Sequence, residues 1–467
     1  MKPFFFLLAF SGLFLYSCSK QGFITGPDAF IDISDDTLQF DTVFVTVGST
    51  TQYFRIYNLN DQKLRLSSVK LMGGTSSFFK MNVDGFSGNE ITDLEIEPND
   101  SLYAFVTVAI DPNAQSLPFV VRDSIQISFN GNKEYVQLEA WGKNAHFLRN
   151  HFITQKNETW TNDLPYVILG GVLVDQNASL TINQGTKVYL HADAPLIVDG
   201  TLIVKGEAFD STRVVFQGDR LDEPYKNFPA GWPGIYFSEN SKNNVLEYAV
   251  IKNAYQGLIV NQPAVNGQPK LTLRSCIIDN CYDAGILGLR SQIIAENCLI
   301  SNCGKNLLLA YGGDYQFTHC TGASFANPYL EHKDPVLFVS DFIKNNNNTI
   351  STAPLNATFT NCIFWGDYGT VENEVAVSKQ GGNFQVNFKN CIWKVKTEPA
   401  NCTVANILSN QYPLFDSINT SKRYFNFRLR EGSPALDKGI ATGLVLDLDG
   451  KPRAKGLPDL GCYERQP

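Results

Sequence analysis

Apolar and polar residues alternate with a period of two through much of the segment from residue 23 to residue 141. The clearest alternating runs are residues 41–45, 52–57, 102–108 and 124–129, and turns rich in Gly and Asn separate them. Alternation places successive side chains on opposite faces of a strand, and dense short strands with such turns are typical of a β-sandwich. The pattern predicts a sandwich of about 100 residues without helices.

Three short motifs in this segment resemble those of the Hydin-type immunoglobulin-like domains. They are Tyr57-Asn58 at the end of an early strand, a turn at residues 97–101, and a last strand that ends at residues 139–142. The resemblance implies an immunoglobulin-like domain at residues 30–145. In such proteins this domain typically acts as a spacer or an interaction module.

After a polar passage at residues 143–163 the sequence begins to repeat itself. Residues 246–254, 273–281 and 295–303 align with one another. A repeat of this length indicates a solenoid, because one unit cannot bury its apolar face alone. Leucine-rich repeats would place leucines at fixed offsets and add a helix to each unit. These units are instead β-branched with Gly or Asn at the corners, which favours a parallel β-helix.

Small apolar residues occupy two aligned positions of this repeat. One position holds Ala249, Cys276, Cys298 and Cys320, and the other holds Ala254, Cys281 and Cys303. Aligned positions of a β-helix stack at about 4.8 Å, so we expect two columns of buried free thiols. Zinc would need clustered Cys and His residues at ligand spacing, and the five histidines are scattered among these columns. We therefore expect no metal site here.

Three asparagines, Asn253, Asn280 and Asn302, also align, each two residues after an isoleucine. Asparagine tolerates the left-handed conformation of a tight corner, and its amide can bond to the same residue on the next rung. The alignment resembles the asparagine ladder of pectate-lyase-like β-helices. The alternative is a polar row that binds a ligand.

The C-terminal segment carries the most specific resemblance. Residues 433–437, 447–453 and 459–464 are similar to the terminal signature of bacterial surface β-helix proteins. With the repeat, this implies a single-stranded right-handed parallel β-helix with a C-terminal cap at residues 146–467, and an all-β chain. Residues 447–450 lack the third acidic residue and the distal glutamate of an EF-hand loop, which favours a capping turn over a calcium site.

The N-terminal residues have the pattern of a secretory signal, with Lys2 before an apolar run at residues 4–16. Residues 15–18 resemble a bacterial lipobox, although Tyr16 is bulkier than the usual residue. We expect a signal peptide at residues 1–17, lipidation at Cys18 and a tether at residues 18–29. The alternative is an ordinary signal with an incidental cysteine. Ser19 implies attachment to the outer membrane, on its periplasmic or its cell-surface side.

Charge narrows the functional classes. The formal net charge is −8 and no long Lys/Arg run appears, so the chain lacks the basic surface of a nucleic-acid-binding protein. On the repeat, Glu247, Arg274 and Glu296 align with alternating sign and form no acidic cluster. A pectate-type lyase needs several carboxylates around Ca²⁺, and an inverting hydrolase needs two carboxylates flanking a water. Neither pattern is evident, and only the lyase alternative calls for a cofactor, Ca²⁺.

Aromatic residues concentrate in long excursions at residues 209–232, 311–348 and 364–382. Rings beside polar groups suit sugar binding, so we expect a glycan-binding face that includes Trp232, Tyr311, Tyr315, Trp365 and Tyr368. In the alternative, Trp365 and Trp393 cap interior stacks. The sequence therefore predicts a lipid-anchored envelope protein that binds an extracellular carbohydrate or an envelope protein without catalysis. The alternative function is a lyase or glycoside hydrolase that acts on acidic polysaccharide.

Overall fold

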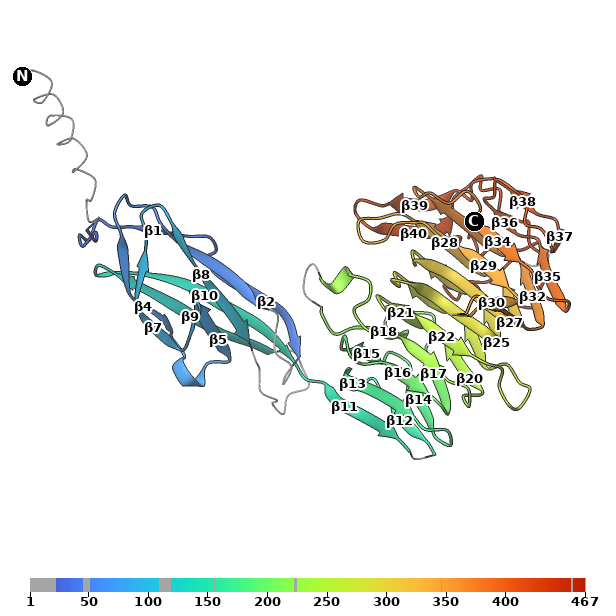
Figure 1. The fold of residues 1–467 in the computed structure, drawn as a ribbon, viewed down its shortest axis with the longest axis horizontal. Coiled ribbons are helices and arrows are strands. Elements are labelled where there is room, and N and C mark those ends of the chain that lie inside the picture. Colours follow the sequence, from blue (N-terminus) through green and yellow to red (C-terminus); the bar gives the residue numbers. More distant parts are fainter. Residues whose placement is uncertain are drawn as a thin grey trace, which may run out of the picture. The chain divides into compact units, whose positions relative to one another are not determined.

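The computed structural model describes residues 22–44, 51–108, 119–154, 156–221, 225–345, 347–454 and 457–466. Contacts divide the chain into two compact units, Met1–Asn144 and Ala145–Pro467. The described part of both units is built from strands, as predicted, with short 3₁₀ turns at Gly74–Ser76 and Tyr225–Asn227 (Figure 1). No helix among these residues is long and apolar enough to cross a membrane. Cys18 and the predicted signal peptide lie outside the described residues.

Among its described residues, the N-terminal unit forms two five-stranded sheets. The first contains, in spatial order, β1 (Ile31–Ile33), β3 (Gln52–Asn58), β8 (Ser101–Val108), β5 (Phe79–Val83) and β6 (Phe86–Ser87). The second contains β2 (Thr37–Phe44), β10 (Asn132–Lys143), β9 (Phe119–Phe129), β4 (Leu64–Leu71) and β7 (Glu90–Ile96). Neighbouring strands are antiparallel except β10 and β2, which are parallel.

The alternation along these strands produces the core of this unit. Phe54 and Ile56 of β3 are fully buried, whereas Tyr53 on the other face is half exposed. The rings of Phe40 and Phe79, which belong to different sheets, lie 5.7 Å apart. Each sheet buries one apolar face against the other, which is the packing of a β-sandwich, so the predicted sandwich is confirmed.

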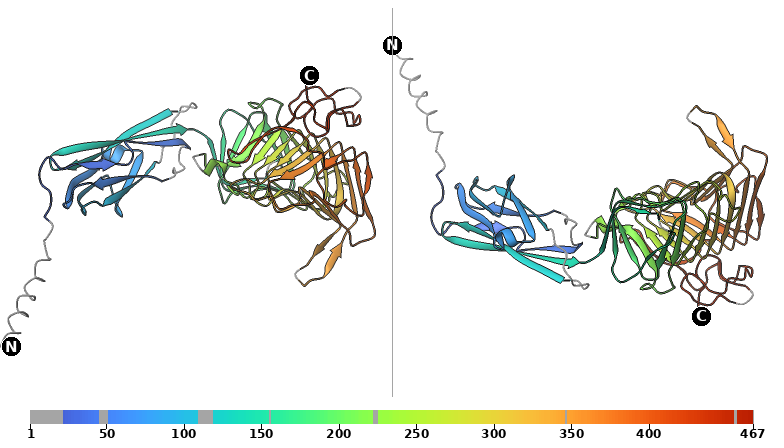
Figure 2. Two further views of the ribbon diagram at one scale, coloured as in Figure 1. Left: turned by 90° about the horizontal axis from the view of Figure 1, so that it is seen from above. Right: turned by 90° about the horizontal axis from the view of Figure 1, so that it is seen from below.

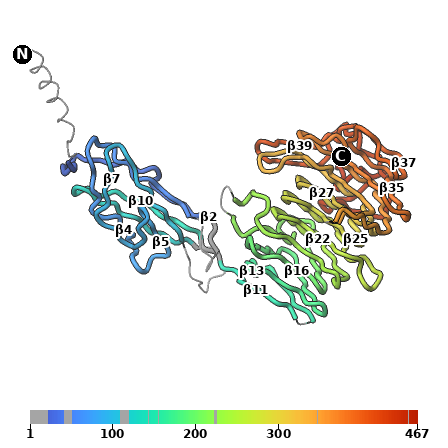
Figure 3. Tube along the Cα trace, in the orientation of Figure 1, coloured from blue at the N-terminus to red at the C-terminus, as the bar shows by residue number. Residues whose placement is uncertain are grey.

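The C-terminal unit is a parallel β-helix in which the coils contribute strands to three sheets, followed from coil to coil in Figure 3. Sheet I contains β12 (Glu158–Trp160), β14 (Ser179–Asn183), β17 (Thr201–Lys205), β20 (Asn244–Glu247), β23 (Leu271–Arg274), the later parts of β25 (Ala284–Glu296) and β27 (Lys305–Thr318), β32 (Leu355–Thr360), β35 (Phe384–Lys389) and β37 (Thr403–Ala405).

Sheets II and III complete each coil. Sheet II contains the first parts of β11 (His146–Ile153) and β13 (Tyr166–Val174), then β15 (Lys187–Leu190), β18 (Val214–Gly218), β21 (Ala249–Lys252), β24 (Ile277–Asp279), β26 (Leu299–Ser301), β28 (Thr321–Phe325), β33 (Ile363–Asp367), β36 (Ile392–Trp393) and β38 (Leu408–Ser409). Sheet III contains the later parts of β11 and β13, then β16 (Leu196–Val198), β19 (Ile235–Phe237), β22 (Leu258–Asn261), the first parts of β25 and β27, β29 (Leu337–Ser340) and β34 (Val375–Ser378).

Cysteines fill one column inside the tube. The register pairs the first residues of β24, β26, β28, β33 and β36. The residue just before each of these strands is a cysteine, and all five are buried and free: Cys276, Cys298, Cys320, Cys362 and Cys391. Burial raises the pKa of the Cys298 thiol well above its usual range, and its Sγ donates to the Glu296 carbonyl at 3.3 Å. The column is therefore a packing element made of neutral thiols.

Left-handed asparagines form the corner between sheets II and III. Asn253, Asn280 and Asn302 have φ angles of 61°, 55° and 48°. Asn280 Nδ2 donates to Asn253 Oδ1 at 2.8 Å, whereas Asn302 Nδ2 donates to Asp279 Oδ1 at 3.3 Å. The amide-to-amide ladder that the resemblance implies thus has one rung at these positions, because the Asp279 carboxylate lies within reach of Asn302 and is the stronger acceptor.

A C-terminal cap, the described residues after 412, covers the outer face of sheet II. Its hairpin of β39 (Phe415–Asn419) and β40 (Tyr424–Leu429) packs Phe415 and Phe427 against Phe325. Leu448 and Leu460 belong to the same buried apolar cluster as Ile363 and Ile392 of sheet II. The two views of Figure 2 show the cap against one side of the coils. The cap thus keeps apolar outer residues of sheet II, such as Leu299, Ile363 and Ile392, out of water.

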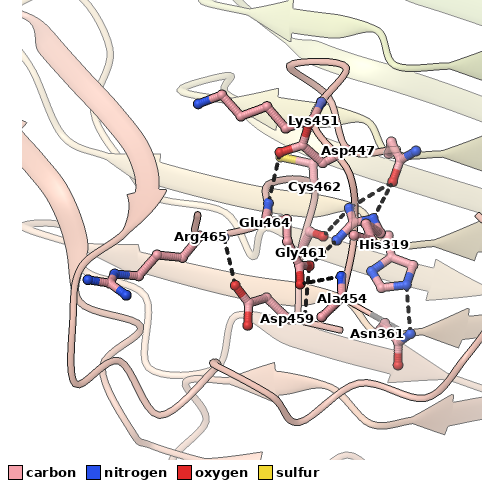
Figure 4. Close-up of polar contacts among 12 residues, drawn as sticks. His319, Asn361, Asp447, Lys451, Ala454, Asp459, Gly461, Cys462, Glu464 and Arg465 are labelled. Carbon is pink, nitrogen blue, oxygen red and sulfur yellow. Dashed lines mark hydrogen bonds and ion pairs between the residues drawn. The ribbon is translucent and has the colours of Figure 1, made fainter. Parts of the chain in front are cut away.

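Asp447 forms a turn at the end of the cap (Figure 4). Its Oδ1 accepts the backbone N–H groups of Asp449 and Lys451 at 2.9 and 2.8 Å, and its Oδ2 accepts that of Glu464 at 2.9 Å. Both carboxylate oxygens therefore serve the backbone, which is the geometry of a capping turn.

A second buried network joins the cap to the corner between sheets I and II. Arg453 and Glu464 form a buried ion pair at 3.1 Å, and Arg453 Nη2 donates to Asn297 Oδ1 at 2.8 Å. Beside them, Asn361 Nδ2 donates to His319 Nε2 at 2.8 Å. Burial, and secondly the charge of Arg453, lower the pKa of His319 to about 3. His319 is therefore neutral in the folded protein at ordinary pH.

Thiol labelling tests the cysteine column. At pH 8, iodoacetamide should modify the partly exposed Cys402 in the native protein and leave Cys298 and its column neighbours intact, because alkylation requires an accessible thiolate. Peptide mass spectrometry with and without urea measures this. Alkylation of Cys298 before unfolding would contradict the buried column.

The network around His319 predicts a pH-dependent stability. Below its unfolded pKa of about 6.5, the unfolded histidine takes up a proton that the folded one refuses, so stability falls as pH drops toward 3. Asn297 and Asn361 show that asparagine fits this left-handed corner. Between pH 7 and pH 4.5 the native protein should lose about 2–3 kcal/mol more than His319→Asn, measured by urea unfolding. Equal losses would refute the assignment.

Candidate functional site

A groove of about 730 Å³ lies at the corner where the chain passes from sheet III to sheet I. Its volume is within the range of about 300–1,000 Å³ that is typical of ligand sites. Seven residues with polar side chains line it: Arg290, Ser291, Gln292, Asp314, Asn356, Asn383 and Gln385. Pro263, Pro354, Leu355 and Phe384 add apolar surface. The groove is open to solvent, and its exposed lining is about equally polar and apolar.

The strand register builds this lining. Gln292 of β25 pairs with Asp314 of β27, which pairs with Asn356 of β32, which pairs with Gln385 of β35. The following residue on each strand points inward and is buried, so the alternation of the sheet turns the four polar side chains outward. Three rung spacings of about 4.8 Å give a ladder of about 14 Å.

The ladder carries little charge. Asp314 is the only carboxylate among the described lining residues, and its Oδ1 accepts a hydrogen bond from Asn356 Nδ2 at 3.0 Å. Arg290, on the rim, places its guanidinium carbon 5.8 Å from the ring centroid of Tyr311. Glycoside hydrolysis ordinarily requires two carboxylates on opposite sides of the bond. The described lining of the groove does not supply that pair.

Buried Asp341 fixes one rim of the groove. It accepts the backbone N–H groups of Gln380 and Gly381 at 2.8 and 2.7 Å, which holds the loop that presents Asn383. The hairpin of β30 (Phe342–Lys344) and β31 (Ile350–Thr352) starts at the same corner and projects away from the coils, in orange in Figure 2. Asp341 therefore lies next to the start of the hairpin and is hydrogen-bonded to the loop.

Tyr315 follows Asp314 on β27, and its ring is buried inside the tube beneath the groove lining. Its hydroxyl donates to the Gly312 carbonyl at 2.9 Å and accepts the Ser291 N–H at 3.3 Å. Gly313 has a φ of 124°, and a Cβ there would lie 2.5 Å from the Ser291 carbonyl oxygen. A glycine is thus required where the chain crosses over this ring.

The aromatic residues proposed for glycan binding do not gather on one face. The assignment does not hold for Trp232, Tyr315 and Trp365, because their side chains are 1%, 1% and 5% exposed and cannot present a ring face to a ligand. Tyr368 is 68% exposed, but its ring lies 6.1 Å from Phe325, beside the cap. Tyr311 is half-buried next to Arg290, so it alone of the five lies beside the groove.

The aligned charges of the repeat form ordinary ion pairs. Arg274 bridges Glu247 at 2.8 Å and Glu296 at 3.3 Å, and Lys305 bridges Asp283 at 2.8 Å. Such partly exposed pairs contribute little each, and they neutralise one another along the sheet. Among the described residues, no group of three or more His, Cys, Asp or Glu side chains could hold a metal ion.

The sequence pattern did not predict the polar ladder of the groove, because the residues of this ladder fall outside the aligned nine-residue units. Gln292, Asp314, Asn356 and Gln385 each precede an inward residue that differs from coil to coil, namely Ile293, Tyr315, Ala357 and Val386. A usable signal does exist, since Asp314 lies 22 residues after Gln292, the spacing of the cysteines. The long hairpin before Asn356 hides the continuation.

Comparison with protein families supports the handedness of the coil. Residues 165–327 match the family model described as the right handed beta helix region. This range covers the coils that precede most of the groove, and it agrees with the right-handed parallel β-helix predicted from the repeat. A comparison with curated proteins finds no match.

Three solved structures are similar to parts of the chain. A family 123 glycoside hydrolase from Clostridium perfringens has 12% identity and a TM-score of 0.20, covering 26% of this chain and 30% of that one. A PapD-like domain of human CEP192 has 11% identity and a TM-score of 0.18, covering 26% and 89%. The catalytic domain of a GH87 α-1,3-glucanase in complex with nigerose has 10% identity and a TM-score of 0.21, covering 78% and 89%. TM-scores this low carry no functional inference.

Proposed function

We propose that the groove binds an extracellular carbohydrate chain without cleaving it. The ladder of Gln292, Asp314, Asn356 and Gln385 is the observation that carries this proposal. Sugar hydroxyls both donate and accept hydrogen bonds, and side-chain amides do the same. A row of such groups about 14 Å long can contact a linear chain at successive positions.

The surface around the ladder also suits a sugar. Phe384 is half-buried and lines the groove beside the polar row, and Lys379 Nζ lies 5.6 Å from its ring centroid. Aromatic faces pack on the apolar face of a sugar ring while polar neighbours bond its hydroxyls. The openness of the groove and its row of hydrogen-bonding side chains favour a carbohydrate over an envelope protein, because protein interfaces have a desolvated core.

The non-catalytic part of the proposal follows from the isolated carboxylate. Asp314 faces Asn356, and the described lining has no second acid to act as proton donor or base partner. Asn356 and Gln385 can position a sugar but cannot transfer protons at neutral pH.

We further propose that the chain is lipidated at Cys18 and held at the outer membrane. The apolar run before Ser17 and the likeness of residues 15–18 to a lipobox support this. Acylation with several chains exceeds the two signals needed for stable anchoring. A carbohydrate-binding coil on such an anchor would keep a polysaccharide close to the cell envelope.

A labelled full-length protein on a polysaccharide array tests binding. The double variant Asn356→Ala/Gln385→Ala should bind its best array target about tenfold or more weakly, because each lost hydrogen bond costs about 0.5–1.5 kcal/mol. The matched control is Gln316→Ala/Asn387→Ala, two outward polar residues of sheet I, on β27 and β35, that do not line the groove. Binding to no polysaccharide, or equal loss in both variants, would reject the proposal. Release of unsaturated products or new reducing ends would reject its non-catalytic part.

Membrane partition tests the anchor. The native protein should fractionate with the outer membrane and carry the mass of a lipid on its N-terminal peptide, whereas Cys18→Ser should be released into the soluble fraction. A lipid-free N-terminal peptide in the native protein would rule out lipidation.

A further inference from the structure

A second cavity, of about 350 Å³, lies at the corner between sheets II and III. Lys252 and Asp279, at the ends of β21 and β24, form one wall with Asn253 and Asn302. The cap hairpin forms the opposite wall, and Tyr329 and Asn227 close the sides. The cavity is distinct from the groove, which lies at the corner between sheets III and I.

Positive charge predominates around this cavity. Three cationic side chains line it, Lys252, Lys422 and Arg423, against the single carboxylate of Asp279. The described lining therefore carries a net charge of +2 when Asp279 is ionised and +3 when it is protonated. Burial lowers the pKa of Lys252 and that of Arg423, which shows that both cations have lost much of their hydration.

Within the described part of the chain, Asp279 makes no hydrogen bond to Lys252 or Arg423. Its Oδ1 already accepts the hydroxyl of Ser301 at 2.6 Å and the amide of Asn302 at 3.3 Å, and burial raises its pKa. The Lys252 ammonium lies on the neighbouring rung, yet within the described part of the chain it makes no hydrogen bond. The Lys252 ammonium is therefore available as a donor, with Asp279 as a charged neighbour rather than a hydrogen-bond partner.

Arg423 shows the same deficit. Its Nη1 donates to the Asn227 carbonyl at 2.9 Å, and its guanidinium carbon lies 4.5 Å from the ring centroid of Tyr329. Its Nε is buried and has no hydrogen-bond partner among the described residues. A buried donor left unpaired costs about 1–3 kcal/mol, and more when the group is charged. A ligand that accepts a hydrogen bond from Arg423 Nε would remove this cost.

We propose that this cavity binds a single oxyanion, a carboxylate or a sulfate group, either free or carried on an acidic sugar. An oxyanion would accept hydrogen bonds from Arg423 and Lys252 and offset the surplus charge. The volume lies at the small end of ligand sites, which suits one anionic group with at most a small carrier. The proposal is independent of the groove and of carbohydrate binding there.

Isothermal titration of the full chain at low salt tests this site. The probes are sodium sulfate and sodium glucuronate, with sodium chloride at equal ionic strength and neutral glucose as controls. Saturable binding of both anions supports a simple oxyanion site, and binding of glucuronate alone supports a sugar acid. No saturable binding of either anion would overturn the proposal.

Two substitutions with opposite expected effects make the test specific. Lys252→Met should weaken anion binding about tenfold or more, because a hydrogen bond to a charged group contributes about 1.5–3 kcal/mol. Asp279→Asn keeps an acceptor for Ser301 but removes the competing negative charge, so it should strengthen anion binding several-fold. A purely structural role for the pair predicts no gain in the Asp279→Asn protein, and that result would overturn the proposal even if Lys252→Met failed to fold.

Two control proteins isolate the site. Lys389→Met removes an exposed, outward lysine of β35 and should leave the anion affinity unchanged. Asn356→Ala/Gln385→Ala should likewise leave it unchanged, so failure at the groove and failure at this cavity give different results. A loss of anion binding in Lys389→Met equal to that in Lys252→Met would mean diffuse charge attraction and reject the cavity.

Discussion

The stacking of parallel rungs at about 4.8 Å is the constraint on which the C-terminal unit depends. Each residue has its counterpart directly above and below it, so each side chain packs against the corresponding side chains of the adjacent coils. Inside the tube this selects the column from Cys276 to Cys391, where a larger group would meet its neighbour. At the corners it selects residues that accept φ near 50°, most of them asparagines.

The same stacking organises the surface. Outward residues on successive rungs lie close enough to interact, so every outward position becomes a row. Where signs alternate, as at Glu247, Arg274 and Glu296, the row neutralises itself. Where the residues are amides, as at Asn356 and Gln385, the row stays open to a ligand. Where the neighbouring carboxylate already accepts hydrogen bonds from other groups, as Asp279 does beside Lys252, the row keeps a surplus of positive charge.

The cap completes the second of these sites. It covers the apolar outer residues of sheet II, among them Leu299, Ile363 and Ile392, with Phe415, Phe427 and Leu460. Its anchoring network centres on the buried pair of Arg453 and Glu464. In covering the sheet, the cap also brings Arg423 against the asparagine corner, far from it in the sequence, and so encloses a cavity that the coils alone would leave open.

The sequence by itself determined the repeat, and with it the parallel coil, its inward cysteines and its alternating charged column, because a 22-residue period fixes which residues stack. It also determined the strand alternation of the N-terminal sandwich. Only the tertiary structure decided which aromatic rings are buried, since Tyr315 and Trp365, expected in excursions, lie on β27 and β33 of the coil. It alone brought Arg423 to Lys252 and extended the amide ladder past the hairpin to Asn356, because contacts across long insertions depend on how the chain returns to the coil.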